Sequence, residues 1–275
     1  MSLTPILSFL PRVRGKLAHP LGGEKVHRTF SHFRLAPREG GRDVLFWYMF
    51  RGSLGCRRCR PLVYPMPEFN RDCLACPRLA SHLARVRDMH PRYYARPVPP
   101  FGDPKARLLI VGLAPGMHGA NRTGRPFTGD HAGILLYETL HKYGFASSPQ
   151  SVHVRDGLVL KNCRITNAVK CLPPGNKPLP KEIVTCNAYL QTELTKLPPK
   201  SVLLALGTVA HDAVLRAFQL KRTGYKFAHG NHHSLPNEIH FVDSYHCSRY
   251  NTQTKRLTTD MFEGVVRKAK ALLPD

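Results

Sequence analysis

The sequence predicts an α/β fold, a three-layer α/β/α arrangement in which helices cover both faces of a central sheet of four parallel strands. Two observations carry this prediction. Segments that read as strands alternate with segments that read as helices, and the strand segments are continuous apolar runs. Continuous runs are typical of parallel strands that are buried on both faces, whereas half-exposed strands alternate polar and apolar residues.

Four apolar runs have the length of a strand. They are RLLIVGL at 107–113, RITNAV at 164–169, SVLLALG at 201–207 and IHFVDSY at 239–245. Helical patterns lie at about 132–143, 181–197, 208–220 and 258–273, the last with Thr258 or Thr259 as N-cap. Because ligands bind beyond the carboxyl ends of parallel strands, we expect the loops that follow these runs to form one functional rim.

Residues 1–64 differ from the rest, since Pro, Gly, Arg and His are scattered there with little periodicity. We expect an irregular basic N-terminal extension and a folded domain over 65–275. The apolar runs are too short to cross a membrane, and the first residues lack the features of a secretory signal. We therefore expect a soluble protein, cytoplasmic and nucleoid-associated if prokaryotic; organelle targeting by the Arg-rich extension is left open.

The net charge indicates a polyanionic partner. Lys and Arg number 41 against 18 Asp and Glu, which gives a formal charge of +23. This excess is far greater than solubility requires and is typical of proteins that bind nucleic acid. A charged tail or a generally basic proteome is the alternative, and composition alone does not separate DNA, RNA and anionic membrane.

The eight cysteines favour metal ligation over disulfides in a chain without a secretory signal. Two pairs have CxxC spacing, and two further cysteines flank a Pro-rich loop. These are Cys56 and Cys59, Cys73 and Cys76, and then Cys171 and Cys186. Four thiolates suit either a tetrahedral zinc ion or an iron–sulfur cluster, and spacing does not choose between them.

Other residues of metal-binding type give weaker signals. Cys163 and Cys247 read as small buried hydrophobic residues. The stretch HGNHHS holds His229, His232 and His233, but it has neither a carboxylate nor two histidines at helical i, i+4 spacing. It therefore does not favour a zinc site.

The loop HGANRTGRPFTGD, at 118–130, carries the chemistry of the predicted rim. Its glycines permit close backbone approach, and Asn121, Arg122 and Arg125 offer hydrogen bonds and positive charge. Phe127 offers a flat surface for stacking, and Asp130 can orient a water molecule or face a developing cation. The loop lacks the Gly-Lys-Ser/Thr ending of a phosphate-binding P-loop and the GxGxxG of a dinucleotide site.

Three long motifs in order carry a family resemblance: GLAPGMHGANRTGRPFTGD, ITNAVKCLPPGNKPLPKEIVTC and SYHCSRYNTQTKRLT. They resemble the uracil-DNA glycosylase superfamily, most closely its fifth family (type b), from about Cys73 to Leu273. The resemblance implies a monofunctional enzyme of base excision repair that flips a deaminated base out of DNA. It would hydrolyse the N-glycosidic bond and leave an abasic site. Uracil is the implied base, with hypoxanthine and xanthine as further ones.

The resemblance also implies a structural [4Fe-4S] cluster. By motif, its ligands are Cys73 and Cys76 in CLACPRL, Cys171 in VKCLPP, and Cys186. The CPRL ending favours this pair over Cys56 and Cys59. The cluster would tie the N-terminal segment of the domain to the loop after the second strand.

The same motifs imply the catalytic residues. Cleavage develops positive charge on the sugar and negative charge on the departing base. Asp130 would position the attacking water and stabilise the sugar cation, and His246 in YHCSRYN would hydrogen-bond the base oxygen. Asp130 as N-cap of the helix that starts near Ala132 is the alternative, and the two roles are compatible.

Further residues of the motifs are implied to contact the base or the DNA. Phe127 would stack on the flipped base and Asn167 would read its edge, while Gly116 and His118 would wall the pocket. A loop that enters the duplex and residues that hold phosphates complete the expected contacts. The expected DNA-binding residues are Asn121, Arg122, Ser248, Arg249 and Asn251.

The sequence departs from the wider pattern at two places. Cys247 stands where the family usually has Pro, which leaves the path of the duplex-entering loop open. The APG of 114–116 carries no Asp or Asn, which is typical of the fifth family and shifts the catalytic role toward Asp130. The catalytic loop holds no lysine, so a Schiff-base lyase step is not indicated.

Two alternatives compete with a broad-range glycosylase. One is a uracil-restricted enzyme like those of the fourth family, and the other is a non-catalytic, metal-stabilised nucleic-acid-binding module. Excision at a single site needs no second copy, so we expect a monomer.

Overall fold

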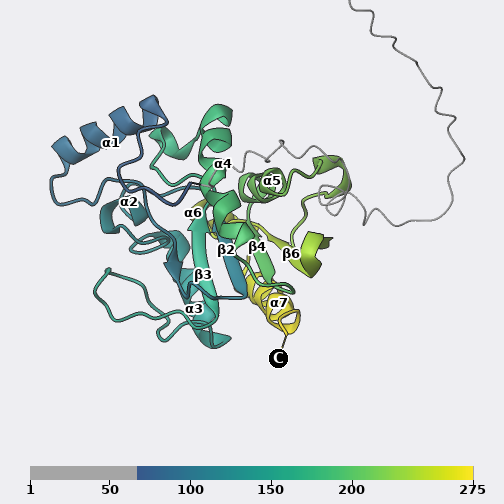
Figure 1. Ribbon diagram of the computed structural model, residues 1–275. Helices are drawn as coiled ribbons and strands as arrows, with labels where there is room; N and C mark the ends of the chain where they lie inside the picture. Colours follow the sequence, from purple (N-terminus) through teal and green to yellow (C-terminus); the bar gives the residue numbers. More distant parts are fainter. Residues whose placement is uncertain (1–66, 275) are drawn as a thin grey trace, which may run out of the picture. The chain divides into compact units, whose positions relative to one another are not determined.

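The computed structural model of the protein describes residues 67–274. They form the predicted α/β fold, with a sheet between two layers of helices (Figure 1). The predicted extension, 1–64, and the cysteines Cys56 and Cys59 lie outside the described residues.

The sheet has six strands in the order β1-β3-β2-β4-β6-β5. The strands are β1 (Phe101–Gly102), β2 (Leu108–Gly112), β3 (Cys163–Asn167), β4 (Val202–Leu206), β5 (His232–Leu235) and β6 (Ile239–Ser244). The four central strands β3, β2, β4 and β6 pair in parallel, as predicted. The edge strands β1 and β5 are antiparallel and were not predicted, because one has two residues and the other is the polar run HHSL.

Seven α-helices and three short 3₁₀ turns surround the sheet in the described residues. The helices are α1 (Pro77–Met89), α2 (Ala120–Thr123), α3 (His131–Lys142), α4 (Pro180–Thr195), α5 (Thr208–Ala217), α6 (Arg249–Gln253) and α7 (Thr259–Ala271). The turns are Pro174–Asn176, Arg222–Gly224 and Pro236–Glu238. Helices α3, α4, α5 and α7 match the four predicted ones. Thr258 caps α7, since its side chain accepts a hydrogen bond from the backbone of Met261.

The central strand β2 shows how the layers form. Leu108 and Ile110 point into a core shared with α3 and α7, and Leu109 and Val111 point into a second core shared with α4 and α5. All four side chains are fully buried. Because successive side chains of a strand face opposite sides, a strand that is apolar at every position requires cover on both faces.

Helix α1 builds a third, smaller core. Leu79, Leu83 and Val86 lie on one helical face and pack with Cys171 and Cys186, from the segment after β3 and from α4. The side chain of Arg78 forms two hydrogen bonds with Glu182 of α4, of 2.7 and 2.8 Å. The start of the domain is thereby attached to the region of the cysteines.

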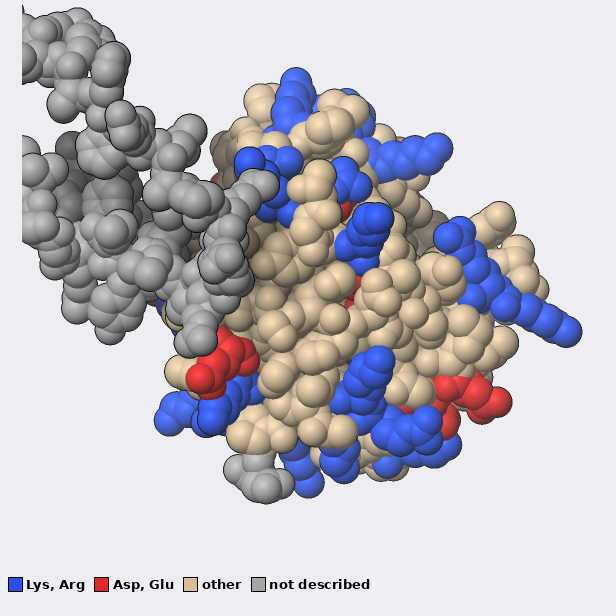
Figure 2. Space-filling view, turned by 90° about the vertical axis from the view of Figure 1, so that its right-hand side faces the viewer, with Lys and Arg blue, Asp and Glu red and all other residues tan. Residues whose placement is uncertain are grey.

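Surface and core agree with two further expectations. Cys163 and Cys247 are fully buried, as predicted. No described helix has the length and apolar character needed to span a bilayer. On the face drawn in Figure 2, Lys and Arg side chains are widely spread, and Asp and Glu appear as a few small groups, the larger ones at the two sides of its lower half.

Candidate active site at the carboxyl ends of the strands

The predicted rim forms where the parallel strands end. Gly112 is the last residue of β2 and pairs in register with Asn167, the last residue of β3. Gly207 follows β4 directly, and His246 lies two residues beyond β6. A Cβ atom built at Gly207 would lie 3.4 Å from the Cβ of His246. Residues far apart in the sequence therefore meet at one edge of the sheet.

Gly112 makes room for two of the predicted base-binding side chains. A Cβ atom at this position would overlap the ring of Phe127 and the side-chain oxygen of Asn167. The ring centroid of Phe127 lies 5.9 Å from that of His246, with the planes tilted by 32°. The structure thus brings Phe127, Asn167 and His246 together. Sequence analysis missed Gly112, although a glycine at the end of an apolar strand signals a close approach.

The backbone of Phe127 is held in an unusual conformation. Its φ is +53°, in the left-handed region that residues with a Cβ rarely adopt. Gly133 packs against this segment, where a Cβ would overlap the carbonyl of Phe127. Such strain costs about 1–3 kcal/mol and is typical of functional sites. Here the left-handed backbone places the buried ring of Phe127 beside Asn167 and His246. We call the space that these three side chains form the slot.

Asp130 is the N-cap of α3, as the alternative interpretation anticipated. Its Oδ1 accepts a hydrogen bond of 2.9 Å from the backbone N–H of Gly133. Its Oδ2 lies on the side of Gly116 and Gly119, and a Cβ at Gly119 would overlap it. Burial raises the pKa of Asp130, opposed by its backbone hydrogen bonds. One oxygen caps the helix, and the other faces the glycine-rich loop.

Burial also sets the charge of His246, because it lowers the pKa of the imidazole to about 4. The ring is therefore neutral at pH 7 and carries one N–H that can donate a hydrogen bond. Asn251 fixes the backbone at His246, because its Nδ2 donates a hydrogen bond of 2.8 Å to the carbonyl of His246. Ser248 caps α6 through the backbone N–H of Asn251.

Asn167 carries a buried acceptor without a partner. The residue is 4% exposed, and its Oδ1 accepts no hydrogen bond from the described residues. A buried unpaired carbonyl oxygen is unfavourable by about 1–3 kcal/mol. Ligand N–H groups are its natural partners.

A partly buried ion pair holds the catalytic loop in place. Arg125, expected to offer hydrogen bonds and positive charge, is only 5% exposed, and it binds Asp156 through its two terminal guanidinium nitrogens, one at 2.9 Å. It also donates to Thr128 at 2.8 Å and to Ser151 at 2.7 Å. Hydrogen bonds from Arg125 and from backbone N–H groups, acting against burial, hold the pKa of Asp156 well below its usual range. Arg125 therefore joins the catalytic loop to the 151–158 loop.

The predicted DNA-binding residues divide into two groups. Arg122 and Arg249 are exposed, and Ser248 and Asn251 are partly exposed. Asn121 differs, because it is fully buried in α2 with its amide nitrogen 3.5 Å from the carbonyl of Met117. As placed, it cannot reach a phosphate, because the short helix turns its side chain inward.

An aromatic residue outside the predicted set supports the rim near His118. The hydroxyl of Tyr93 lies 2.8 Å from Nδ1 of the exposed His118, and the ring of His90 stacks on Tyr93 at 4.6 Å. A groove of about 720 Å³ continues from here along the 151–158 loop. Its lining includes three arginines, Arg92, Arg122 and Arg155.

The four cysteines implied by the resemblance come from three segments that meet. Cys76 is the residue before α1, and Cys73 lies three residues earlier. Cys171 follows β3 and Cys186 lies in α4, and both are buried in the core that α1 closes. Burial and the neighbouring thiols raise the pKa of Cys171 far above its usual value. A thiol in such surroundings stays protonated unless a metal ion or a cluster displaces the proton.

The spacing of these thiols bears on the zinc alternative. Two ligands of one tetrahedral zinc ion lie about 3.8 Å apart, given Zn–S bonds of about 2.3 Å. Within the described part of the chain, no three of the cysteine Sγ atoms lie within 4.8 Å of one another. The backbone N–H of Lys170 donates to Sγ of Cys186 at 3.3 Å, a contact suited to an anionic sulfur site. These thiols are candidate ligands of a metal ion or an iron–sulfur cluster.

Comparisons with known proteins place this geometry in a family. The family model of the uracil DNA glycosylase superfamily matches residues 99–270. A type-5 uracil-DNA glycosylase of Thermus thermophilus is 48% identical over 205 residues, covering 73% of this chain and 93% of that protein. One of Mycobacterium bovis is 42% identical over 208 residues, covering 73% of this chain and 78% of that protein. The chain belongs to the type-5 uracil-DNA glycosylase family.

The fourth family is a more distant match. A type-4 uracil-DNA glycosylase of Archaeoglobus fulgidus is 35% identical over 159 residues, which cover 58% of this chain and 67% of that protein. The expected resemblance to the fifth family is therefore confirmed.

The Arg125–Asp156 ion pair gives a first prediction. Asp156→Asn removes the charge that compensates a buried guanidinium, so we expect the free energy of unfolding to fall by roughly 2–4 kcal/mol. Thermal unfolding monitored by circular dichroism measures this effect. Glu263→Gln is the matched control, because it breaks the exposed pair with Lys142 (2.6 Å) and should change little. Equal losses in both variants would contradict a special role for the pair of the buried Arg125 with Asp156.

The neutral state of His246 gives a second prediction. Its pKa is about 4 in the folded protein and about 6.5 in an unfolded chain, so between these values the unfolded state binds more protons. The corresponding stability is present above pH 6.5 and is lost as the pH falls toward 4. We expect a smaller loss over this range in His246→Gln, measured as melting temperature against pH. Parallel curves for the two proteins would show that the imidazole is not buried as a neutral group.

Proposed function

We propose that the protein hydrolyses the N-glycosidic bond of uracil, hypoxanthine and xanthine in DNA and leaves an abasic site. Family membership makes it a DNA N-glycosylase, which is a hydrolase. The observation that carries the proposal is the slot formed by Phe127, Asn167 and His246 at the strand ends, next to Asp130. A base can enter it only after leaving the stack.

The Asn167 carboxamide supports a range of deaminated bases. Uracil, hypoxanthine and xanthine share a ring N–H beside a carbonyl, and cytosine and adenine present the opposite pattern. The unpartnered Oδ1 of Asn167 would accept from the ring N–H while its amide nitrogen donates to the carbonyl. Thymine and guanine share this edge, and their stable pairing in the duplex makes them harder to flip.

The reaction divides between the two sides of the scissile bond. As the C1′–N bond breaks, its electron pair moves to the base, and the neutral His246 donates a hydrogen bond to the base oxygen that gains charge. On the sugar side, Asp130 uses the oxygen not engaged by Gly133 to orient water and stabilise the cation. Water adds to C1′, and its proton is passed on to solvent or to the base. Phe127 stacks on the base throughout.

Exposed residues beside the slot would hold the DNA. The exposed Arg122 and Arg249 would contact phosphates, and Ser248 and Asn251 would set the loop that approaches the duplex. Tyr250, 69% exposed at the start of α6, is suited to enter the space that a flipped base leaves. We expect the protein to act as a monomer. We expect it to be nucleoid-associated if the source is prokaryotic.

Cys73, Cys76, Cys171 and Cys186 would hold a [4Fe-4S] cluster in this proposal. When bound, the cluster supplies a structural cross-link and takes no part in the hydrolysis. Its ligand residues fasten α1 and α4 to the segment after β3. Because that segment follows Asn167 by four residues, the cross-link also steadies the base-reading side chain.

Asp130→Asn separates the helix cap from catalysis. Asn caps a helix about as well as Asp, so the helix should keep its cap. The change removes a carboxylate, and burial raises the pKa of that carboxyl group. We expect excision of uracil and hypoxanthine from duplex oligonucleotides to fall at least about 100-fold. The melting temperature should be equal or higher. Alkaline cleavage of the abasic product measures the reaction.

Other outcomes point to other functions. Undiminished turnover in Asp130→Asn would remove Asp130 from the mechanism. Cleavage of uracil but not hypoxanthine by the native protein would indicate a uracil-restricted enzyme. DNA binding without excision of either base, in cluster-loaded protein, would indicate a non-catalytic binding module.

The cluster is tested by composition. We expect about four iron and four sulfide ions per chain in the purified protein, and their loss in Cys171→Ser. Cys163→Ala is the matched control, because Cys163 is buried in a different core and should leave the iron content unchanged. One zinc ion per chain without sulfide would refute the cluster.

A further inference from the structure

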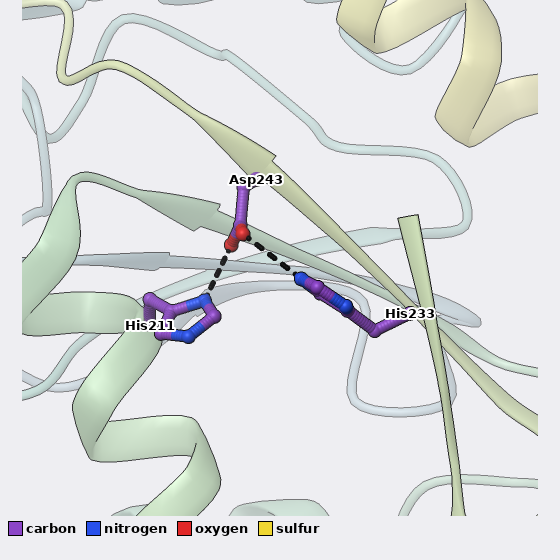
Figure 3. Close-up of side chains that lie close together, drawn as sticks. All are labelled: His211, His233 and Asp243. Carbon is purple, nitrogen blue, oxygen red and sulfur yellow. Dashed lines mark hydrogen bonds and ion pairs between the residues drawn. The ribbon is translucent and has the colours of Figure 1, made fainter. Parts of the chain in front are cut away.

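A second group of polar side chains lies between α5 and the edge of the sheet formed by β6 and β5. It is separate from the slot. His211 comes from α5, His233 from the edge strand β5, and Asp243 from β6 (Figure 3). Asp243 is fully buried and His211 is almost fully buried. The function proposed above makes no use of these three residues.

The carboxylate of Asp243 lies between the two imidazole rings (Figure 3). Its Oδ1 is 2.7 Å from Nδ1 of His211, and its Oδ2 is 3.3 Å from Nε2 of His233. One ligand atom from each of the three residues lies within 4.8 Å of the other two. Atoms this close are candidates to bind a single ion together.

A hydrogen bond from Nε2 of His211 defines which of its two ring nitrogens carries the proton. Nε2 lies 3.0 Å from the backbone carbonyl oxygen of Tyr225, which can only accept, so Nε2 carries a proton. In the neutral ring, Nδ1 then points its lone pair at Asp243, which also only accepts. Two acceptors this close require a positive charge, which a second proton on Nδ1 supplies at this distance. A metal ion can replace that proton when the two atoms move slightly apart to the spacing of ligands on one ion. A ring N–H bound to a backbone carbonyl is typical of histidines that ligate metals.

We propose that His211, His233 and Asp243 bind a divalent transition-metal ion of the Zn²⁺ class. Two imidazole nitrogens and one carboxylate oxygen form a ligand set that zinc commonly takes in proteins. The side chain of His233 is 13% exposed, so the site opens to solvent on that side. Water can therefore complete a four-coordinate shell, and the ion has a path of entry.

The site would act by positioning. It joins α5 to two neighbouring strands, and β6 runs from Asp243 directly toward His246, three residues later. None of its ligands reaches the slot. A bound ion would therefore stabilise the domain and hold the end of β6 and would leave the chemistry to the rim.

The test uses the full chain with its own iron content intact and Zn²⁺ alone as the probe. Wild type, His233→Gln and His232→Gln are dialysed against Zn²⁺, washed, and analysed for zinc and iron per chain. His232 is the matched control, because it neighbours His233 on β5, points to the opposite face and contacts His240 at 3.0 Å. The folding of His233→Gln is checked first, in the presence of a chelator that removes free metal. If that variant does not fold, His211→Gln takes its place as the ligand variant.

We expect one zinc ion per chain in wild type and His232→Gln, and none in His233→Gln or His211→Gln. Zn²⁺ should raise the melting temperature of the first two proteins only. In the difference spectrum before and after Co²⁺ is added in place of Zn²⁺, the visible bands of a tetrahedral site should appear without new thiolate charge-transfer absorption. No retained zinc, equal zinc in the ligand variants, or a thiolate band would each overturn the proposal and leave a proton between His211 and Asp243.

Discussion

Parallel pairing of the four central strands is the constraint on which the rest of the structure depends. Because β3, β2, β4 and β6 run in one direction, their carboxyl ends open onto the same edge, and Gly112 and Asn167 stand side by side in register. The strands are buried on both faces, so a slip in register would disturb two cores at once. The site is consequently set by the same packing that stabilises the domain.

Around that edge, several groups are held in states that are unfavourable without a ligand. Burial raises the pKa of Asp130 and lowers that of His246, Phe127 has a left-handed backbone, and Asn167 keeps an unpaired oxygen. In the proposed reaction, a flipped nucleotide would supply a developing cation beside Asp130, a developing anion beside His246 and an N–H for Asn167. Binding energy is thus directed to the charges that develop in the reaction.

The two candidate metal sites differ in chemistry and in place. The thiols of the N-terminal segment and α4 lie by the β3 side of the sheet, where α1 closes a small core of its own. His211, His233 and Asp243 lie at the opposite edge and offer nitrogen and oxygen. The soft thiol ligands are therefore kept apart from the imidazole and carboxylate ligands. Because the two ligand sets prefer different metals, each candidate site would select a different one.

Apolar periodicity and capping act over short ranges, so the four parallel strands, the four main helices and the loops of the rim could all be predicted from the amino-acid order. The motifs indicated Asp130, Phe127, Asn167 and His246 and the family. Folding, in contrast, buries Asn121, turns Arg125 toward Asp156 and sets Asp243, an ordinary strand residue, between two histidines. HGNHHS showed no carboxylate of its own; the missing ligands come from a helix and a strand that only folding brings near, since contacts between distant segments leave no local pattern in the chain.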